Sequence, residues 1–249
     1  MHIEILTLFP GIFCGPLQES ILNVAQKKGL LSITLVDIRD CCYDKHKTAD
    51  DEPYGGGPGM VMKPEPLTAA IESRLAKFPE STIIFLSPQG KLFNQEKARE
   101  LARKPNLLLI CGRYEGIDER VKQLFAHEEI SIGDYVLTGG EIPALVIVDA
   151  VTRLIPGVVG NPDSVTTDSF SDDGAGFDYP HYTRPAVFRG VEVPAVLASG
   201  NHAKIRLWRR KQALKKMMLI RPELIQSDAL TEEDNKLIDE IKAERNHKE

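Results

Sequence analysis

Residues 82–112 read TIIFLSPQGKLFNQEKARELARKPNLLLICG, and this stretch decides the fold class. Its two ends, Thr82–Leu86 and Asn106–Cys111, are short runs that are apolar almost throughout, as strands covered on both faces are. Between them, Gln95–Arg103 has the apolar spacing of an amphipathic helix. A strand, a helix and a second such strand predict a parallel β-α-β unit.

The same alternation runs through the first two thirds of the chain. Further strands are expected at Ile3–Phe9, Ser32–Asp37 and Glu129–Ile132. Further helices are expected at Leu17–Lys28, Pro66–Ala76, Asp118–Phe125 and Glu141–Leu154. The predicted fold class is therefore α/β, with a mostly parallel sheet covered on both faces in a domain that spans residues 1–160.

The periodicity then stops. Residues 161–176 form a polar, glycine-rich stretch without a base, and we expect a flexible loop between domains. Its acids are Asp163, Asp168, Asp172 and Asp173. Residues 177–249 are expected to form a small helical domain, with one helix from the cap candidates Ser199–Asn201 to about Ile220 and a last helix opened by Thr231–Asp234. The expected buried face of the first helix is Ala203, Leu207, Leu214, Met217 and Met218.

Composition excludes several classes of protein. The chain has 249 residues, of which 42% are apolar and 27% charged, the balance of an ordinary globular protein. No apolar run has the length of a membrane span, and Glu4 stands where a signal peptide needs bases, so we expect a soluble cytoplasmic protein. The four cysteines form no CxxC pair and the histidines no HExxH motif, so no metal site is predicted.

The charge is distributed unevenly. From His202 to Arg221 there are eight Lys and Arg and no acid. The remaining 23 Lys and Arg stand against all 36 Asp and Glu, a formal charge of −13. A basic stripe on an acidic protein is typical of a surface that binds a polyanion, although a solvated helix face is an equal alternative at this point.

Three glycine-bearing loops follow predicted strands: Ser87–Gly90, Cys111–Gly116 and Ser131–Glu141. Ligands of parallel sheets bind at the carboxyl ends of the strands, so the three loops predict a pocket lined by backbone groups and suited to a flat heterocycle. A fourth segment, Gly55–Gly59, lacks the GK[ST] of a phosphate-binding loop, and no GxGxxG follows the first strand. The residues alone therefore predict a small-molecule site at the sheet edge and a polyanion as partner, without identifying either ligand.

Six motifs in order extend this interpretation. They are Asp51–Met60, Leu86–Gly90, Cys111–Arg120, Ile132–Glu141, Asp168–Phe170 and Pro180–Pro185. Together they resemble the bacterial tRNA (guanine-N1)-methyltransferases of the SPOUT superfamily, over essentially the whole chain. The resemblance implies methyl transfer from S-adenosylmethionine to N1 of the guanosine at position 37 of tRNA, just 3′ of the anticodon. It also implies a homodimer, a requirement for magnesium, and a C-terminal trefoil knot in the sheet, which general topology rules would not predict.

The resemblance assigns residues to these roles. The cofactor would be bound by Leu86, Ser87, Pro88, Gly112, Glu115, Ile132, Gly133, Asp134, Tyr135, Val136, Leu137, Gly139 and Gly140. Because N1 of guanine must lose a proton, a general base is needed, and this role falls to Asp168, with Arg153 stabilising charge that develops towards O6. The residues expected to contact RNA are His181, Arg184, Lys204, Arg206, Arg209, Arg210, Lys211 and Lys215. No carboxylate cluster predicts a dedicated magnesium site.

Two alternatives stay open. Another knotted RNA methyltransferase, acting on a ribose 2′-hydroxyl or another base, would share the cofactor pocket, and Asp168 with Pro180–Pro185 argues against it. A non-catalytic RNA-binding relative would bind the cofactor without turnover. A nucleotide-binding enzyme that holds phosphate in the glycine loops is disfavoured by the missing GK[ST] and GxGxxG.

Overall fold

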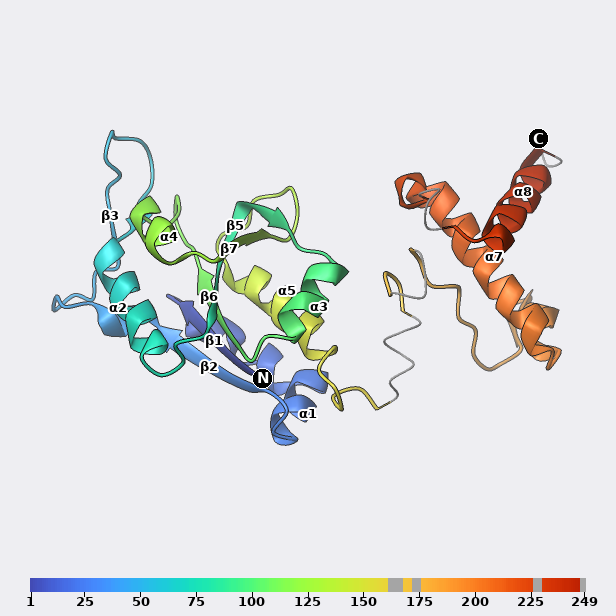
Figure 1. Ribbon diagram of the computed structural model, residues 1–249, viewed down its shortest axis with the longest axis horizontal. Coiled ribbons are helices and arrows are strands. Elements are labelled where there is room, and N and C mark those ends of the chain that lie inside the picture. The colour runs from blue at the N-terminus through green and yellow to red at the C-terminus, as the bar shows by residue number, and fades with distance from the viewer. Residues whose placement is uncertain (161–167, 172–175, 226–229, 247–249) are drawn as a thin grey trace. The chain divides into compact units, whose positions relative to one another are not determined.

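The structure is a computed structural model that describes residues 1–160, 168–171, 176–225 and 230–246 (Figure 1). The chain divides into two units, Met1–Gly160 and Asn161–Glu249. Of the loop predicted for residues 161–176, positions 161–167 and 172–175 lie outside the described residues, and so do three of its four acids, Asp163, Asp172 and Asp173.

The first unit contains the parallel sheet that the sequence predicts. Its strands lie in the order β2-β1-β6-β5-β7, and every neighbouring pair is parallel. Their bounds are β1 His2–Thr7, β2 Ser32–Asp37, β5 Thr82–Leu92, β6 Asn106–Cys111 and β7 Glu128–Ser131. The helices of this unit are α1 Ser20–Lys27, α2 Pro64–Leu75, α3 Gln95–Ala102, α4 Glu119–Phe125 and α5 Glu141–Thr152. A short antiparallel pair, β3 Asp50–Asp51 and β4 Val61–Met62, lies outside the sheet.

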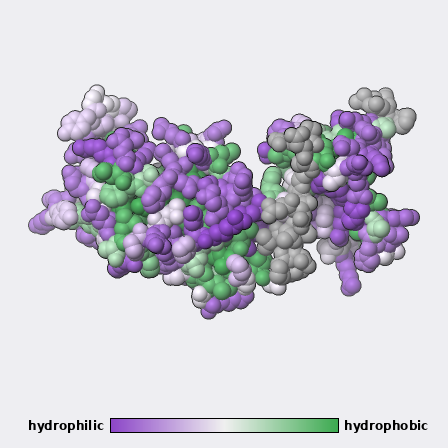
Figure 2. Space-filling view, viewed as in Figure 1, coloured by the Kyte–Doolittle hydropathy of each residue, from purple (hydrophilic) through white to green (hydrophobic). Residues whose placement is uncertain are grey.

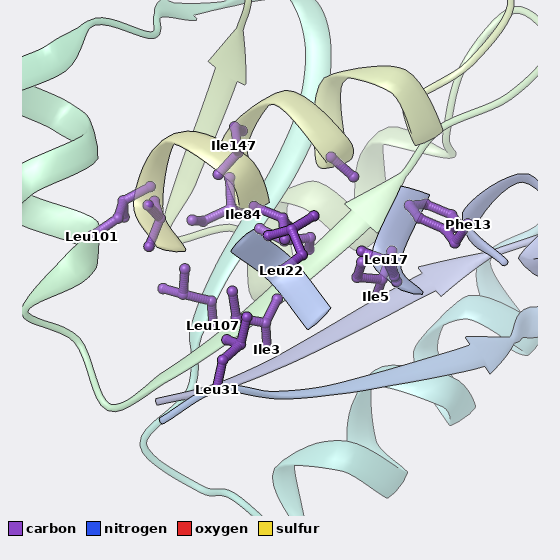
Figure 3. Close-up of a cluster of buried hydrophobic side chains, with 14 of the residues drawn as sticks. Ile3, Ile5, Phe13, Leu17, Leu22, Leu31, Ile84, Leu101, Leu107 and Ile147 are labelled. Atoms are coloured by element: carbon purple, nitrogen blue, oxygen red, sulfur yellow. The ribbon is translucent and has the colours of Figure 1, made fainter. Parts of the chain in front are cut away.

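Helices cover both faces of the sheet because its strands alternate two apolar faces. Ile84 and Leu107 point towards α1, α3 and α5, in the cluster that Figure 3 shows with Leu22, Leu101 and Ile147. Neighbouring strand residues belong to a second cluster on the opposite face, with α2 and α4; these include Ile83, Phe85, Leu108 and Ile110. The α/β prediction is confirmed.

Several predicted elements have different bounds in the structure; the strand predicted as Thr82–Leu86, for example, continues to Leu92, and at two places proline explains the difference. The strand predicted as Ile3–Phe9 ends at Thr7, because Pro10 opens a 3-10 helix, Pro10–Phe13. The helix predicted as Leu17–Lys28 begins at Ser20, after a second 3-10 helix at Pro16–Gln18. Proline fixes φ and lacks a backbone donor, so it ends regular hydrogen bonding at these points.

The carboxyl end of β5 is interrupted. Leu86 and Lys91 both pair with Ile130 of β7, so Ser87–Gly90 leaves the ladder between them. A Cβ at Gly90 would lie 2.5 Å from the Glu129 carbonyl carbon, so only glycine lets β5 approach β7 so closely here. The interruption forms one wall of the pocket described below.

The second unit is built on α7, His202–Ile220, and α8, Glu232–Asn246. Leu214 and Met217 of α7 pack against Leu237, Ile238 and Ile241 of α8. The predicted capping box is confirmed: the backbone N–H of Asp234 donates to the Thr231 hydroxyl (3.1 Å), and that of Thr231 donates to the Asp234 carboxylate (3.0 Å). A small hairpin, β8 Val187–Phe188 and β9 Val191–Glu192, was not predicted.

Part of the predicted buried face of α7 is wrong. Ala203 is exposed, and Leu207 is half-buried. The buried residues are instead Ala213, Leu214 and Met217, near the end where α8 covers the helix. Leu214 and Met217 lie where the apolar side chains of α8 pack, whereas the start of α7 contacts α8 through charged groups, as Arg206 does with Glu233.

Candidate functional site

A cavity of about 260 Å³ opens at the carboxyl ends of β5, β6 and β7. Twelve of the predicted cofactor residues line it: Leu86, Ser87, Pro88, Gly112, Glu115, Ile132, Gly133, Tyr135, Val136, Leu137, Gly139 and Gly140. Asp134 lies outside this lining. Polar side chains that the sequence analysis did not single out, among them Tyr114, Lys122 and Thr138, also line the cavity. The three predicted loops therefore do meet at one edge of the sheet.

Glycine lets two wall segments touch through their backbones. The N–H of Gly140 donates to the Gly112 carbonyl (2.9 Å), and a Cβ on Gly140 would lie 2.7 Å from the Cα of Cys111. Gly139 forms an isolated antiparallel bridge with Arg113. Burial and the nearby Glu141 carboxylate raise the pKa of the Cys111 thiol well above its ordinary value, so Cys111 stays neutral beneath this contact.

Another part of the wall is a tight turn just after β7. Gly133 has φ +152°, a conformation that side chains rarely adopt. The ring of Tyr135 occupies the space of the missing Cβ, and its hydroxyl donates to the Ile132 carbonyl (3.2 Å). The loop therefore presents backbone groups and an aromatic ring to the cavity, which suits a flat heterocyclic ligand.

The glycine-rich segment before β4 supports Glu115. The backbone N–H of Glu115 donates to the Met60 carbonyl (3.0 Å), and that of Met62 donates to the Gly116 carbonyl (2.9 Å). The Glu115 side chain lies where a Cβ on Gly59 would be, 2.4 Å from that position. The segment Asp51–Met60 therefore contacts the pocket residue Glu115 rather than the cavity itself. Position 59 is glycine because a side chain there would overlap the Glu115 side chain.

Tyr114 lies in the left-handed region beside the cavity, with φ +59°. Burial and the neighbouring Asp50 carboxylate raise the pKa of its phenol above the ordinary value. Tyr114 therefore stays protonated at neutral pH and can donate a hydrogen bond but not serve as a base.

Arg153 is far from the cavity within its own chain. It follows the last residue of α5, whose first turn lies at the cavity wall beside Gly140. Twelve helical residues at 1.5 Å each separate the two ends of α5 by about 18 Å. Just beyond, the Gly157 carbonyl accepts from Lys28 Nζ (2.9 Å), near the start of β2. Arg153 therefore lies towards the amino-terminal edge of the sheet and the cavity at its carboxyl edge.

Asp168 belongs to the second unit, and local contacts anchor its segment there. The Asp168 carbonyl accepts from the Ser171 N–H (3.1 Å), and the Phe170 N–H donates to the Gly176 carbonyl (2.7 Å). The rings of Phe170 and Phe177 meet edge to face, with centroids 6.0 Å apart. Because Phe177 packs on the α7–α8 core, the candidate base is tied to the helical unit.

The basic stripe of α7 is partly neutralised by α8. Arg206 forms two hydrogen bonds with Glu233 (2.6 and 2.8 Å), and Arg210 pairs with Asp234. Lys211 contacts Glu240 and Glu244 (2.6 and 2.8 Å). Three of the predicted RNA contacts on α7 are therefore paired with acids of α8, and His181 lies 2.7 Å from Asp178, which the sequence analysis did not anticipate.

Other predicted RNA contacts lie on the surface of the second unit. Lys204, Arg209, Lys215, His181 and Arg184 are exposed, and Figure 2 shows a mostly hydrophilic surface over α7 and α8. Aromatic rings accompany these cations. The Arg209 guanidinium lies 4.4 Å from the Tyr179 ring. Two tilted ring pairs lie beside it, Tyr179 with His181 (centroids 4.7 Å apart) and Tyr182 with Trp208 (6.2 Å). Cations interleaved with aromatic rings are typical of surfaces that bind single-stranded RNA.

Two further findings concern metals and membranes. Within the described ranges, no three His, Cys, Asp or Glu gather as ligands for a metal ion. None of the helices that the structure describes has the length and apolar character needed to cross a bilayer.

Comparison with known proteins identifies the family. The profile of the tRNA (guanine-1)-methyltransferase (TrmD) family matches residues 1–227. Similar proteins named tRNA (guanine-N(1)-)-methyltransferase occur in Dictyoglomus turgidum (57% identical, over 98% of each chain) and Geobacter metallireducens (53%, over 97% of this chain and 98% of the relative). Another, from Dehalococcoides mccartyi, is 52% identical over the full length of both. The chain thus belongs to the tRNA (guanine-1)-methyltransferase family, enzymes that methylate tRNA with S-adenosylmethionine.

Proposed function

We propose that this enzyme methylates N1 of the guanosine at position 37 of tRNA and holds S-adenosylmethionine in the cavity at the carboxyl ends of β5, β6 and β7. The observation that carries the proposal is the cavity itself, because three separate family motifs supply its walls. When bound, S-adenosylmethionine supplies an electrophilic methyl group.

The wall residues fit such a ligand. Backbone groups of Leu86–Pro88 and Ile132–Leu137 are suited to the donors and acceptors of an adenine ring, and Gly139 and Gly140 allow close approach. Glu115, held against Gly59, offers a carboxylate to the polar end of the cofactor or to the entering guanine. The target base must leave its stack to reach this pocket.

Asp168 is the proposed general base. N1 of guanine carries a proton at neutral pH, and it becomes nucleophilic when this proton passes to the Asp168 carboxylate. A carboxylate exposed to water is a weak base, so we propose that the segment of Asp168 closes over the target and excludes water. Its anchoring to the helical unit supports a role in which tRNA binding brings the base into place.

Arg153 of the partner subunit is the proposed cation that stabilises charge developing at O6. The length of α5 supports this assignment, since it separates Arg153 from the cavity of its own chain by about 18 Å. The enzyme would then act as a homodimer. Ile142 and Val146, one turn apart on α5 and 50% and 40% exposed, offer apolar surface for the contact.

Lys204, Arg209 and Lys215, with His181 and Arg184, are the proposed contacts to tRNA phosphates. Arg206, Arg210 and Lys211 would contribute less, because α8 already neutralises them. We propose that Tyr182 and Trp208 supply the stacking surface beside them. A tRNA substrate also supports the expected cytoplasmic location.

We further propose that the sheet carries the trefoil knot of the SPOUT superfamily. β7 lies at the edge of the sheet beyond β5, yet Gly140 after it returns to Gly112 at the end of β6. This return crosses the end of β5, where Ser87–Gly90 leaves the ladder. Such a crossing is what a knotted chain requires.

Magnesium remains an expectation of the family alone. Within the described residues no three metal ligands come together, and three of the four loop acids lie outside them, so no step is assigned to the ion.

The test is methyl transfer to tRNA transcripts that carry guanosine at position 37, with the methylated nucleoside mapped. We expect N1-methylguanosine at that position, and a loss of at least a hundredfold in kcat for Asp168→Asn, the usual size of a general-base contribution. Methylation of a ribose or of another base would favour the alternative of another knotted RNA methyltransferase. Cofactor binding without any transfer would favour a non-catalytic relative.

Mixed dimers of two variants test which subunit supplies Arg153 to the site. Arg153→Gln lacks the cation, and Leu137→Trp fills the cavity, so each homodimer should be inactive. In a mixed dimer, the intact cavity of the first variant receives the intact Arg153 of the second, and we expect activity to return. Inactive mixed dimers would place Arg153 in the site of its own chain.

A further inference from the structure

Glu141 is a buried acid to which the reaction assigns no role. It is the first residue of α5 and only 1% exposed. The hydroxyl of Thr7, fully buried at the end of β1, donates to Glu141 Oε1 (2.7 Å). Arg113 Nε lies 2.9 Å from Oε2 as an ion pair that lacks the alignment of a hydrogen bond. A buried carboxylate needs such partners, because an unpaired charge away from water is strongly unfavourable.

This ion pair underlies the cavity wall. Arg113 Nη1 donates to the Thr138 carbonyl (3.1 Å), and its guanidinium stacks 4.4 Å from the Phe9 ring. A Cβ on Gly139 would lie 2.3 Å from Arg113 Nε and 2.6 Å from Glu141 Oε2. The backbone of the wall therefore rests directly on the pair, and Thr138 is held by it.

We infer that Thr7 and Glu141 are positioning residues for cofactor binding. Thr7 orients the Glu141 carboxylate, Glu141 orients Arg113, and Arg113 holds the Thr138 carbonyl and with it the Val136–Gly140 wall. Neither Thr7 nor Glu141 is among the residues that line the cavity. The inference rests on the proposed function, because it assumes that S-adenosylmethionine occupies this cavity.

A second buried ion pair on the same strand provides a matched control. Glu4 of β1 is also 1% exposed, and its Oε1 lies 3.0 Å from Arg74 Nε of α2. α2 covers the other face of the sheet, and neither Glu4 nor Arg74 lines the cavity. Breaking this pair perturbs a buried charge of the same kind without touching the Val136–Gly140 wall.

The experiment compares Thr7→Val, Thr7→Ser, Glu141→Gln and Glu4→Gln in the full chain. S-adenosylmethionine binding is measured by titration calorimetry, the KM values for both substrates by steady-state kinetics, and stability by thermal unfolding. Thr7→Val keeps the shape of the side chain but loses the hydroxyl, and we expect about a tenfold rise in the Kd for S-adenosylmethionine. Glu141→Gln should raise it similarly, with an unchanged KM for tRNA. Thr7→Ser should restore binding, and Glu4→Gln should lower the Tm while binding S-adenosylmethionine normally.

Two results would overturn the inference: wild-type S-adenosylmethionine affinity in Thr7→Val and Glu141→Gln, or an equal loss in Glu4→Gln. If Glu141→Gln does not fold, Thr7→Val and Thr7→Ser decide the question alone. Leu137→Trp separates this inference from the proposed function. If Leu137→Trp binds S-adenosylmethionine normally, both the proposed cofactor site and the positioning role are wrong. If Leu137→Trp loses binding while Thr7→Val and Glu141→Gln bind normally, only the positioning role is wrong.

Discussion

At Gly140 two walls of the cavity touch through their backbones. Its N–H donates to Gly112, and its Cα faces the backbone of Cys111 with no room for a side chain. Backbone atoms cannot move aside as the end of a flexible side chain can. A single methyl group at this position therefore tests whether the contact between the walls matters for binding.

We expect Gly140→Ala to lower the free energy of unfolding by about 1–3 kcal/mol and to weaken S-adenosylmethionine binding, because the 139–140 segment must shift away from Cys111. Thermal unfolding and titration calorimetry measure the two effects. Gly15→Ala is the control, since a Cβ there meets no described atom within 4 Å and Gly15 has helical dihedral angles. Unchanged binding in Gly140→Ala would show that the wall tolerates displacement.

The α7–α8 pair depends on ion pairs as well as on its apolar core. Burial alone raises the pKa of Asp234, but hydrogen bonds from Arg210 and Thr231 outweigh burial and hold that pKa below its ordinary value. A carboxyl with a depressed pKa in the folded state stabilises the protein above its unfolded pKa, and this stability is lost as the pH falls through the folded value. The α7–α8 pair should therefore lose the stabilisation by ionised Asp234 as the pH falls below about 4.

Trp208, the one tryptophan of the sequence, lies in α7 and reports this unit selectively. We expect urea unfolding followed by its fluorescence to show Asp234→Asn less stable than wild type at pH 7. The difference in stability should narrow as the pH falls below about 4, the ordinary pKa of an unfolded Asp, and towards the lowered pKa of folded Asp234. A difference that stays constant over this range would mean that the ionised carboxylate does not stabilise the pair.

The sequence predicted elements better than contacts between elements. Apolar runs such as Asn106–Cys111 are strands because they are buried on both faces, and this pattern is local. The pairing of Arg206 with Glu233 was missed, although both residues were visible, because it depends on how α7 packs on α8. The loops of the cavity were predicted from their place after strands. The supporting role of Gly59 and of Glu141 was not, since each acts across the fold on a distant segment.

In the whole molecule, the proposed function divides the chemistry between the two units. The first unit holds the cavity, and the second holds Asp168 and the exposed cations of α7. Phosphate contacts release bound counterions, so the affinity for tRNA should fall steeply with salt. Most of this salt dependence of tRNA affinity should come from cations of the second unit.

We expect Lys204→Gln and Lys215→Gln each to weaken tRNA binding and to reduce the slope of log Kd against log salt concentration by about one. Filter binding at several salt concentrations gives the slope. Lys97→Gln is a control with the same charge change, because Lys97 of α3 is already paired with Glu100 and Glu128. An equal change of slope in Lys97→Gln would argue for a general charge effect rather than contacts along α7.

We propose above that the glycine-bearing loops at the carboxyl edge of the sheet bind S-adenosylmethionine. Hydrogen–deuterium exchange of the full-length protein, with and without S-adenosylmethionine, tests it most directly because it locates binding along the chain. We predict slower exchange in residues 86–89, 112–117, 131–133 and 135–140, which line the cavity. Saturated binding with protection confined to other segments would contradict it.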